Sequence, residues 1–281
     1  MPPERMTVHQ EPISAKRDWF QVKGGELFFE YAGNGDPVVF LHGFGLDSRM
    51  WNPQCEGLQS GYRILRYDLR GFGRSSTLPP SEYAHEGDLQ ALLSHLGVES
   101  AHIVGLSMGG RIALRFAAGY PQMVQSLVLA DSALDGYSWS NDWQRRWQAL
   151  CDLAKAEQLS EARRQYFEHP LFASARTNPA CAAFLSSMID DYSGSHWQGQ
   201  DRPRMPSPPL AGRLMEIRIP SLVITGSRDL PDFLEIADVL FAGLPRARRE
   251  VIEGSGHMVN LEAPAIFNEM LRGFWQSLSR T

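Results

Sequence analysis

Short runs of β-forming residues alternate with helical stretches along most of this chain of 281 residues. Several of the runs are almost wholly apolar, which is typical of strands buried on both faces of a parallel sheet. Helical patterns fill the intervals, so the rhythm predicts an α/β fold, with a mostly parallel twisted sheet and flanking helices. Gly24-Gly25 predicts a tight hairpin between the first two strands. We expect strands at 18–23, 26–31, 38–42, 62–68, 101–106, 124–130, 221–225 and 246–253, and helices at about 49–59, 82–97, 108–119, 232–243 and 263–278.

One long stretch interrupts this rhythm. From about residue 133 to residue 214 no strand pattern is present, and the segment is helical, aromatic and rich in proline at its end. An insertion of this length between two strands is too long for a structureless loop. We therefore predict an inserted helical cap at 133–214 over the C-terminal edge of the sheet, a core made of 18–132 and 215–281, and a polar N-terminal extension at 1–17.

The composition excludes several classes of protein. Hydrophobic residues make up 43% and charged residues 21% of the chain, which are ordinary globular values. The net charge of −5 and the isoelectric point near 5.9 disfavour a nucleic-acid-binding face. No apolar run approaches the roughly 18 residues that a membrane helix needs. The charged N-terminus also lacks the apolar stretch of a secretory signal.

We therefore expect a cytoplasmic protein that acts on a small molecule and binds neither nucleic acid nor membrane. The cysteines fit this compartment, because Cys55, Cys151 and Cys181 are odd in number and match no zinc or redox spacing. We expect them to be ordinary thiols. Neither composition nor pattern specifies an oligomeric state.

The motif with the most chemical content is Gly105-Leu106-Ser107-Met108-Gly109. It follows a predicted strand and opens a predicted helix, which is the strand–turn–helix setting of a nucleophile elbow. The flanking glycines permit close backbone approach, and the helix N-terminus favours the negative charge that develops beside it. We predict that Ser107 is a catalytic nucleophile; the alternative is a serine that only caps the helix.

An attacked carbonyl needs two N–H donors for its developing oxyanion. One is expected from Met108, the residue after the nucleophile. The second is expected from Phe44 in the loop His42-Gly43-Phe44-Gly45, where the glycines allow the Phe44 amide to turn inward. We expect His42 to orient this loop rather than to perform chemistry.

The serine also needs a base, and imidazole has the nearest pKa. Of the eight histidines, only His257 follows a predicted strand in a short flexible turn, Gly254-Ser255-Gly256. That turn lies at the same sheet edge as Ser107, so we predict that His257 is the base. His169 and His196 belong to the predicted cap, where they are candidates for substrate contact.

The acid that orients the histidine has three candidates. Asp229 follows the strand at 221–225, again at a C-terminal strand end, and is favoured. Asp131, at the end of the strand at 124–130, is a rival because its carboxylate could also reach the histidine. Asp232 is the weakest candidate because it begins a helix. The order Ser107, Asp229, His257 matches the order expected for this architecture.

Together these residues resemble the α/β-hydrolase superfamily from about residue 20 to the end of the chain. The resemblance rests on His42–Gly45, on the Asp68–Ser75 turn, which reads Asp-x-Arg-Gly-x-Gly-x-Ser, and on the Ser107 elbow, Gly226–Asp229 and His257. It implies a serine hydrolase of the carboxylesterase or enol-lactonase kind that needs no metal or other cofactor. Epoxide hydrolases and haloalkane dehalogenases belong to the same superfamily but have an aspartate at the nucleophile position, so Ser107 disfavours both activities. Carbon–carbon bond hydrolases usually carry a Gly-Pro-Gly that Phe44-Gly45-Leu46 lacks.

The predicted cap contains aromatic residues at helical spacing. Trp139, Trp143 and Trp147 recur at every fourth residue, on one helix face. We expect this face mainly to pack the cap onto the core, but residues at that seam also cover the cleft. The candidate substrate contacts are Trp139, Trp143, Met188 and Trp197. The motif loops contain no arginine or lysine pair, which disfavours a highly anionic substrate, although Arg145, Arg146 and Arg163 in the cap keep that option open.

The sequence thus predicts a carboxylic ester hydrolase that cleaves a small to medium ester or lactone through an acyl-enzyme on Ser107. Two alternatives stay open. One is an enol-lactonase of aromatic degradation, and the other is a ligand receptor that keeps the same residues but turns over slowly.

Overall fold

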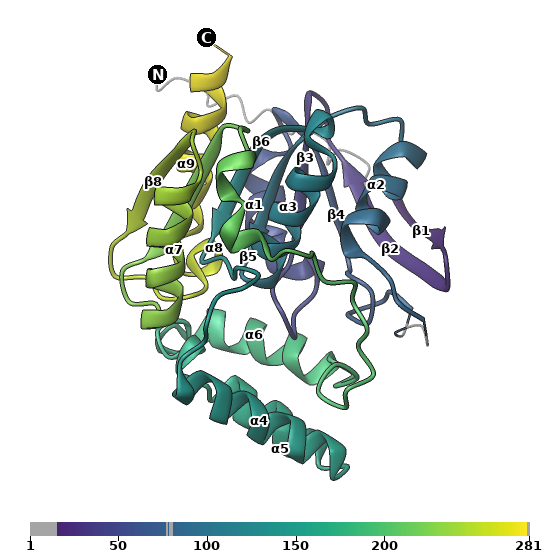
Figure 1. The fold of residues 1–281 in the computed structure, drawn as a ribbon, viewed down its shortest axis with the longest axis vertical. Helices are drawn as coiled ribbons and strands as arrows, with labels where there is room; N and C mark the ends of the chain where they lie inside the picture. The colour runs from purple at the N-terminus through teal and green to yellow at the C-terminus, as the bar shows by residue number, and fades with distance from the viewer. Residues whose placement is uncertain (1–15, 77, 79–80, 280–281) are drawn as a thin grey trace, which may run out of the picture.

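The computed structural model describes residues 16–76, 78 and 81–279. Within these residues, eight strands form one sheet in the order β1-β2-β4-β3-β5-β6-β7-β8 (Figure 1). The first two pairs, β1 with β2 and β2 with β4, are antiparallel, and all later neighbours are parallel. The strands are β1 (Lys16–Val22), β2 (Gly25–Ala32), β3 (Asp36–Leu41), β4 (Tyr62–Tyr67), β5 (Ala101–Leu106), β6 (Val124–Ala130), β7 (Ser221–Gly226) and β8 (Ala247–Ile252).

Helices cover both faces of this sheet. The core helices are α1 (Asn52–Leu58), α2 (His85–His95), α3 (Met108–Gly119), α7 (Pro231–Gly243), α8 (Val259–Glu262) and α9 (Pro264–Leu278). The connection from β3 to β4 runs in the opposite direction across the sheet from the later connections. Since parallel crossovers are right-handed, α1 lies on one face and α2, α3 and α7 lie on the other. Helix α9 packs against α1, for example through the bond from Asn268 Nδ2 to the Pro53 carbonyl.

The predicted fold class and all eight predicted strands are confirmed, with ends that differ by at most two residues. The hairpin turn differs by one position, because Gly25 already pairs with Val22 and the turn is Lys23-Gly24. Gly24 takes a φ of 82°, a conformation that favours glycine. Of the predicted extension at 1–17, Lys16 and Arg17 belong to β1, and residues 1–15 lie outside the described residues.

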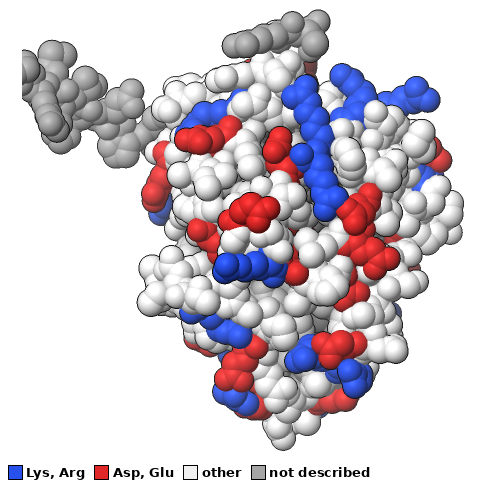
Figure 2. All heavy atoms as spheres, turned by 90° about the vertical axis from the view of Figure 1, so that its left-hand side faces the viewer, with Lys and Arg blue, Asp and Glu red and all other residues white. Residues whose placement is uncertain are grey.

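The segment between β6 and β7, which we call the insert (residues 133–214), contributes no strand to the sheet. It contains the helices α4 (Asn141–Lys155), α5 (Leu159–Phe167) and α6 (Pro179–Asp191). Figure 1 shows the three helices together at the bottom of the view, below the sheet. In the described part of the chain, no helix combines the length and hydropathy needed to cross a bilayer. On the face drawn in Figure 2, basic and acidic side chains are interspersed and do not gather into one basic patch.

The parallel strands fix where chemistry can occur. Because β3, β5, β6 and β7 run in the same direction, the residues that follow them meet at one edge of the sheet. Ligands of open α/β sheets bind at this carboxyl edge. The loops that arrive there begin with His42, Ser107, Asp131 and Ser227.

Candidate active site

Ser107 lies between β5 and α3 in a strained backbone conformation. Its φ of 56° and ψ of −115° are rare for a residue with a side chain. The surrounding structure holds this conformation, because the Ser107 N–H donates to the Ala130 carbonyl at 3.0 Å, and the Ser107 carbonyl accepts from Arg111 N at 3.1 Å and Ala133 N at 3.0 Å. The side chain is only 7% exposed and lines a cavity.

The flanking glycines are required by close backbone contacts. A Cβ at Gly105 would lie 2.2 Å from the Gly109 carbonyl oxygen, and a Cβ at Gly109 would lie 2.1 Å from the Leu41 carbonyl oxygen. Both distances are far below contact distance, so neither position accepts alanine without displacement of the backbone. The Gly-x-Ser-x-Gly pattern therefore reflects tight packing of α3 against β3 and β5.

The loop after β3 lies against Ser107. A Cβ built at Gly43 would be 3.7 Å from the Ser107 Cβ, so the two segments are in van der Waals contact. Phe44 is fixed by the Tyr166 hydroxyl, which donates to its carbonyl at 2.9 Å. Among the described residues, the Phe44 N–H has no protein acceptor. Met108 is the first residue of α3, where N–H groups lack intrahelical partners.

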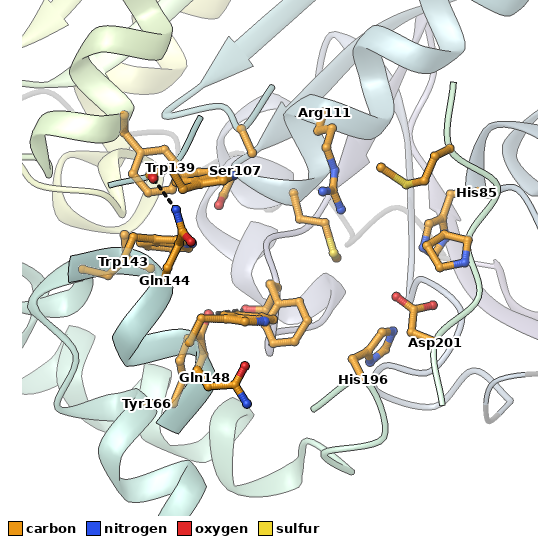
Figure 3. Close-up of a pocket in the computed structure, with 18 residues that line it drawn as sticks. His85, Ser107, Arg111, Trp139, Trp143, Gln144, Gln148, Tyr166, His196 and Asp201 are labelled. Carbon is orange, nitrogen blue, oxygen red and sulfur yellow. Dashed lines mark hydrogen bonds between the residues drawn. The ribbon is translucent and has the colours of Figure 1, made fainter. Parts of the chain in front are cut away.

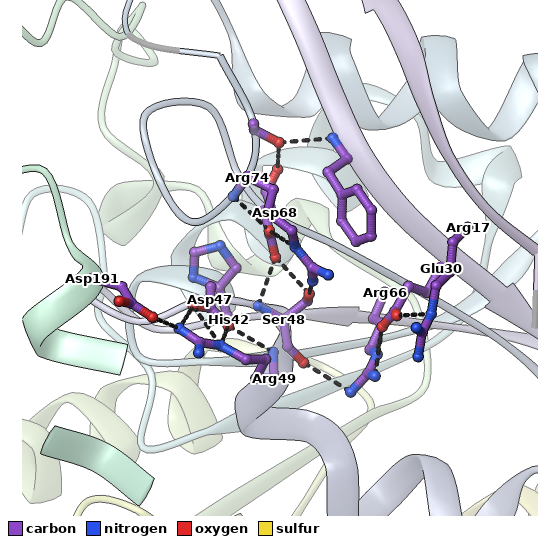
Figure 4. A network of polar contacts seen from close by, with 12 residues as sticks. Arg17, Glu30, His42, Asp47, Ser48, Arg49, Arg66, Asp68, Arg74 and Asp191 are labelled. Atoms are coloured by element: carbon purple, nitrogen blue, oxygen red, sulfur yellow. Dashed lines mark hydrogen bonds and ion pairs between the residues drawn. The ribbon is translucent and has the colours of Figure 1, made fainter. Parts of the chain in front are cut away.

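His42 orients this loop, as predicted. Its Nε2 accepts from Leu69 N at 2.9 Å, so its Nδ1 donates to the Gly43 carbonyl at 2.8 Å. The Asp68–Ser75 turn is held by a polar network (Figure 4), in which Asp68 accepts from Ser48 N and Arg74 N, both at 2.9 Å. Burial lowers the pKa of His42, which keeps its ring neutral. These groups support the loop and do not line the cavity.

His257 follows β8 and pairs with Asp229, which follows β7. The distance from His257 Nδ1 to Asp229 Oδ2 is 2.9 Å, and both side chains are almost completely buried. Gly226 allows this approach, because a Cβ there would lie 2.1 Å from the Gly256 carbonyl oxygen. The bond to Asp229 occupies Nδ1, so Nε2 is the ring nitrogen that is available for proton transfer.

His257 Nε2 is buried without a partner. Within residues 16–76, 78 and 81–279, no hydrogen bond joins it to Ser107 Oγ, and Ser107 Oγ bonds to no other group. Phe233 contacts the base and also lines the cavity. Its ring centroid lies 4.3 Å from that of His257, and it lines the same cavity as Ser107. Catalytic hydrogen bonds are often long in structures without substrate.

The rival acid, Asp131, lies beside the pair. Ligand atoms of Asp131, Asp229 and His257 are all within 4.8 Å of one another. Asp131 Oδ1 accepts from Gly226 N at 3.0 Å, and its Oδ2 has no partner within the part of the chain that the structure describes. Burial, followed by the charge of Asp229, raises the pKa of Asp131 well above its usual range. Asp131 therefore retains a proton more readily than an ordinary carboxyl. The imidazole of His257 bonds to Asp229 and not to Asp131 among the described residues.

The same three groups would be the candidate ligands for a metal ion. The bond between His257 and Asp229 uses one possible ligand atom of each, and Asp131 Oδ1 is occupied by Gly226 N. A hydrogen-bonded acid–base pair accounts for their proximity. The third acid candidate, Asp232, accepts from Ser140 N at 2.9 Å and from Ser140 Oγ at 2.7 Å, so it anchors the start of α4.

A cavity of about 570 Å³ opens at Ser107 (Figure 3). Its walls come from the core and from the insert. Trp139 and Trp143, two of the four predicted substrate contacts, line it. Trp197 and Met188, the other two predicted substrate contacts, are not among the residues that line it. Both are buried, at 0% and 1% exposed, and the Trp197 ring packs against Tyr166 and Tyr192.

Several wall residues were not predicted from the sequence. Arg111 lies four residues after Ser107 on the same helix face, and this spacing was a signal that could have placed it in the cavity. Of the two histidines considered in the insert, His196 lines the cavity and His169 does not. The other wall residues that were not predicted come from several helices and loops: His85, Ala133, Gln144, Gln148, Tyr166, Leu171, Asp201, Pro203, Met205 and Phe233.

Comparisons with known proteins agree with this architecture. A sequence profile described as alpha/beta hydrolase fold matches residues 36–264. The chain is 29% identical over 247 residues to 3-oxoadipate enol-lactonase 1 of Acinetobacter baylyi, which covers 87% of this chain and 90% of the relative. It is also 29% identical to a 2-hydroxy-6-oxononadienedioate/2-hydroxy-6-oxononatrienedioate hydrolase of Paraburkholderia phymatum, over 95% of this chain and 97% of that relative. Among solved structures, a thermophilic esterase of Thermogutta terrifontis aligns with a TM-score of 0.79 and 26% identity, covering 94% of this chain and 99% of the other.

Proposed function

This chain belongs to the alpha/beta hydrolase fold family, and we propose that it is a serine hydrolase that cleaves a carboxylic ester or lactone through an acyl-enzyme on Ser107. The observation that carries the proposal is the buried His257–Asp229 pair, whose unpartnered Nε2 lies at the sheet edge that also bears the strained Ser107. A hydroxyl, an imidazole and a carboxylate supplied by β5, β8 and β7 are the parts needed for acyl transfer.

In the first half of the reaction, Ser107 Oγ attacks the substrate carbonyl carbon and His257 Nε2 takes the hydroxyl proton. Asp229 stabilises the resulting imidazolium through Nδ1. The amides of Phe44 and Met108 donate to the oxyanion. Such a donor contributes about 3–4 kcal/mol in the transition state. The alcohol then leaves with the proton from His257.

In the second half, water takes the place of the serine hydroxyl. His257 removes a proton from the water, the water oxygen attacks the acyl carbon, and Ser107 leaves with its proton restored. The product is a carboxylic acid, and the enzyme returns to its starting state. No other group is required for either half.

We infer that the insert acts as a cap over this site. Several insert residues line the cavity opposite Ser107, and Tyr166 bonds to the Phe44 carbonyl of the proposed oxyanion loop. A cavity of about 570 Å³ suits a small to medium substrate. We also propose that the protein is cytoplasmic and acts on a small-molecule substrate.

Lactone hydrolysis is a second candidate within the same mechanism. The similarity to an enol-lactonase over 87% of the chain favours it. Carbon–carbon bond cleavage is less favoured than ester or lactone hydrolysis. The chain is similar to a 2-hydroxy-6-oxononadienedioate hydrolase, but Phe44-Gly45-Leu46 lacks the Gly-Pro-Gly that is usual in carbon–carbon bond hydrolases. A cyclic ester and an open ester both present an acyl carbon to the serine nucleophile, so the same proposed mechanism applies to either substrate.

The proposal is tested by turnover of p-nitrophenyl acetate and butyrate and of a panel of lactones, together with labelling by a fluorophosphonate. We expect sustained turnover, and a covalent adduct on the peptide that contains Ser107. A burst of one equivalent followed by near silence would support the slow receptor instead. Adduct formation at a different residue would contradict the assignment of the nucleophile.

A further inference from the structure

The cavity has a second polar end that the proposed reaction does not use. Arg111 lies one turn along α3 from Ser107, and Figure 3 shows its guanidinium pointing into the cavity. His85, His196 and Asp201 line the side of the cavity away from Ser107 in the same view. None of these four residues has a role in the acyl-transfer steps.

The guanidinium of Arg111 has unused hydrogen-bonding capacity. It reaches the carboxylate of Asp135, with 3.9 Å between Nε and Oδ1. However, Arg115 already binds both oxygens of Asp135, at 2.7 and 2.6 Å. Among the described residues, the Arg111 guanidinium donates no hydrogen bond, and its Nε is buried without a partner. The Arg111 side chain is 32% exposed and that of Arg115 only 3%, so Arg115 is structural and Arg111 faces the cavity.

Two neutral histidines lie at this end. His196 Nδ1 pairs with the Tyr192 hydroxyl at 2.9 Å. His85 is 5% exposed. Neither the buried Nε2 of His196 nor Nδ1 of His85 has a hydrogen-bond partner among the described residues. Burial lowers the pKa of His196 to about 3 and the pKa of His85 well below its usual value, so both rings are neutral near pH 7. A neutral imidazole still offers one N–H donor.

Asp201 is the acidic side chain among the described wall residues. Its Oδ1 accepts from the Tyr83 hydroxyl at 2.5 Å, and no ion pair joins it to Arg111 in the described part of the chain. Burial raises the pKa of Asp201, against the opposing effect of Arg111 and Arg115. The carboxylate of Asp201 is thus held by a tyrosine, and the charge of Arg111 is left facing the ligand space.

We propose that Arg111 binds a carboxylate of the substrate, with His85 and His196 as neutral donors beside it, so that the substrate is a half-ester or lactone of a dicarboxylic acid. This inference rests on the proposed function. A guanidinium can bind a carboxylate through two parallel N–H bonds. One helical turn rises about 5.4 Å, which suits an acyl chain with a few methylene groups between its two carbonyl carbons. Water is added across the acyl C–O bond, so that a half-ester gives an alcohol and a dicarboxylate, and a lactone gives a single hydroxy-dicarboxylate.

The test compares monomethyl adipate with methyl heptanoate, two esters of matched length that differ in terminal charge. The readout is the ratio of their kcat/KM values, because a loss common to both substrates cancels. In Arg111→Gln we expect this ratio to fall roughly tenfold or more, since hydrogen bonds to charged groups are lost. Arg111→Lys should keep an intermediate ratio, because it keeps the charge without the planar pair of donors.

Arg145→Gln is the matched control, since Arg145 is 77% exposed on α4 and does not line the cavity. Its ratio should equal that of the unmodified protein. Asp201→Asn should raise the ratio by about threefold, because a like charge is removed from the same wall. An unchanged ratio in Arg111→Gln would overturn the inference.

A binding measurement separates this inference from the proposed function. Calorimetric titration with adipate needs no turnover, and circular dichroism shows whether each variant folds. We expect adipate to bind the unmodified protein, and to bind Arg111→Gln roughly tenfold more weakly or not at all. Equal affinities would contradict the carboxylate site, whereas specific adipate binding without cleavage of any ester would contradict only the hydrolase. If Arg111→Gln does not fold, a preference of the unmodified protein for methyl heptanoate over monomethyl adipate would count against the site.

Discussion

The two walls of the cavity are held in different ways. On the core wall, the backbone fixes each group: Ser107 is held in a strained conformation by three main-chain hydrogen bonds, and Gly105 and Gly109 pack at distances that no side chain allows. On the insert wall, side chains pack on side chains, as where the Trp139 and Trp143 rings stack with centroids 4.6 Å apart. Substitutions on the core wall should therefore abolish activity or strongly destabilise the fold, whereas substitutions on the insert wall should change substrate preference by degrees.

The two acids beside His257, Asp229 and Asp131, also differ in the groups that hold them. Asp229 bonds to the imidazole, whereas Asp131 bonds to the Gly226 amide and has a raised pKa. Two buried carboxylates this close favour a state in which one holds a proton. Identical side chains thus have unequal expected roles because only one of them bonds to the ring.

The largest expected effect is that of Ser107→Ala. Without the hydroxyl no acyl-enzyme forms, and kcat/KM for p-nitrophenyl butyrate should fall by roughly 10⁴-fold or more. Ser187→Ala is the control, since Ser187 lies on α6 and, among the described residues, its hydroxyl bonds only to the Phe184 carbonyl. Activity of the Ser107 variant within tenfold of the unmodified protein would refute the nucleophile.

Next in size is Asp229→Asn, which should reduce kcat by about 10³- to 10⁴-fold because the amide favours the wrong tautomer of His257. Asp131→Asn should cost about tenfold or less, because an asparagine can still accept from Gly226 N and can donate to Asp229 as a protonated Asp131 would. Both variants are assayed with p-nitrophenyl butyrate. The opposite ranking would assign the acid to Asp131.

The packing of the core wall is tested by stability. Gly109→Ala places a Cβ 2.1 Å from the Leu41 carbonyl oxygen, and it should lower the free energy of unfolding by about 3 kcal/mol. Gly273→Ala is the matched control in another helix, where no atom of the described residues packs within 4 Å of the added Cβ. It should stabilise the protein by about 0.5–1 kcal/mol. Denaturant unfolding measures both, and equal effects would remove the contrast between the two positions.

The smallest expected effect belongs to the insert wall. Trp143→Ala should change the ratio of kcat/KM for p-nitrophenyl octanoate over acetate by about tenfold, because it removes apolar surface that a long acyl chain contacts. Trp19→Ala, on β1 and 51% exposed, is the control. If Trp143→Ala abolished cleavage of both esters to the extent of Ser107→Ala, the insert wall would not be graded and the comparison would fail.

Much of this architecture could be predicted from the sequence, because it depends on local signals. Periodicity located every strand of the sheet, and a glycine before and after Ser107 indicated the elbow. The positions of His257 and Asp229 at strand ends followed from the parallel sheet, whose carboxyl ends share one edge.

The rest depended on how distant segments pack. Tryptophans at helical spacing have the same pattern whether they face a cavity or a core, so the sequence could not show that Trp143 lines the cavity and that Trp197 is buried. Arg111 and Arg115 lie on one helix four residues apart, and only the position of Asp135 decides which guanidinium is neutralised. The sequence by itself determined the order of the elements and the sheet edge where chemistry can occur, because periodicity and glycine requirements are local. Tertiary structure alone decided which side chains share the cavity and which carboxyl bonds to His257, because these outcomes depend on contacts between residues far apart in the chain.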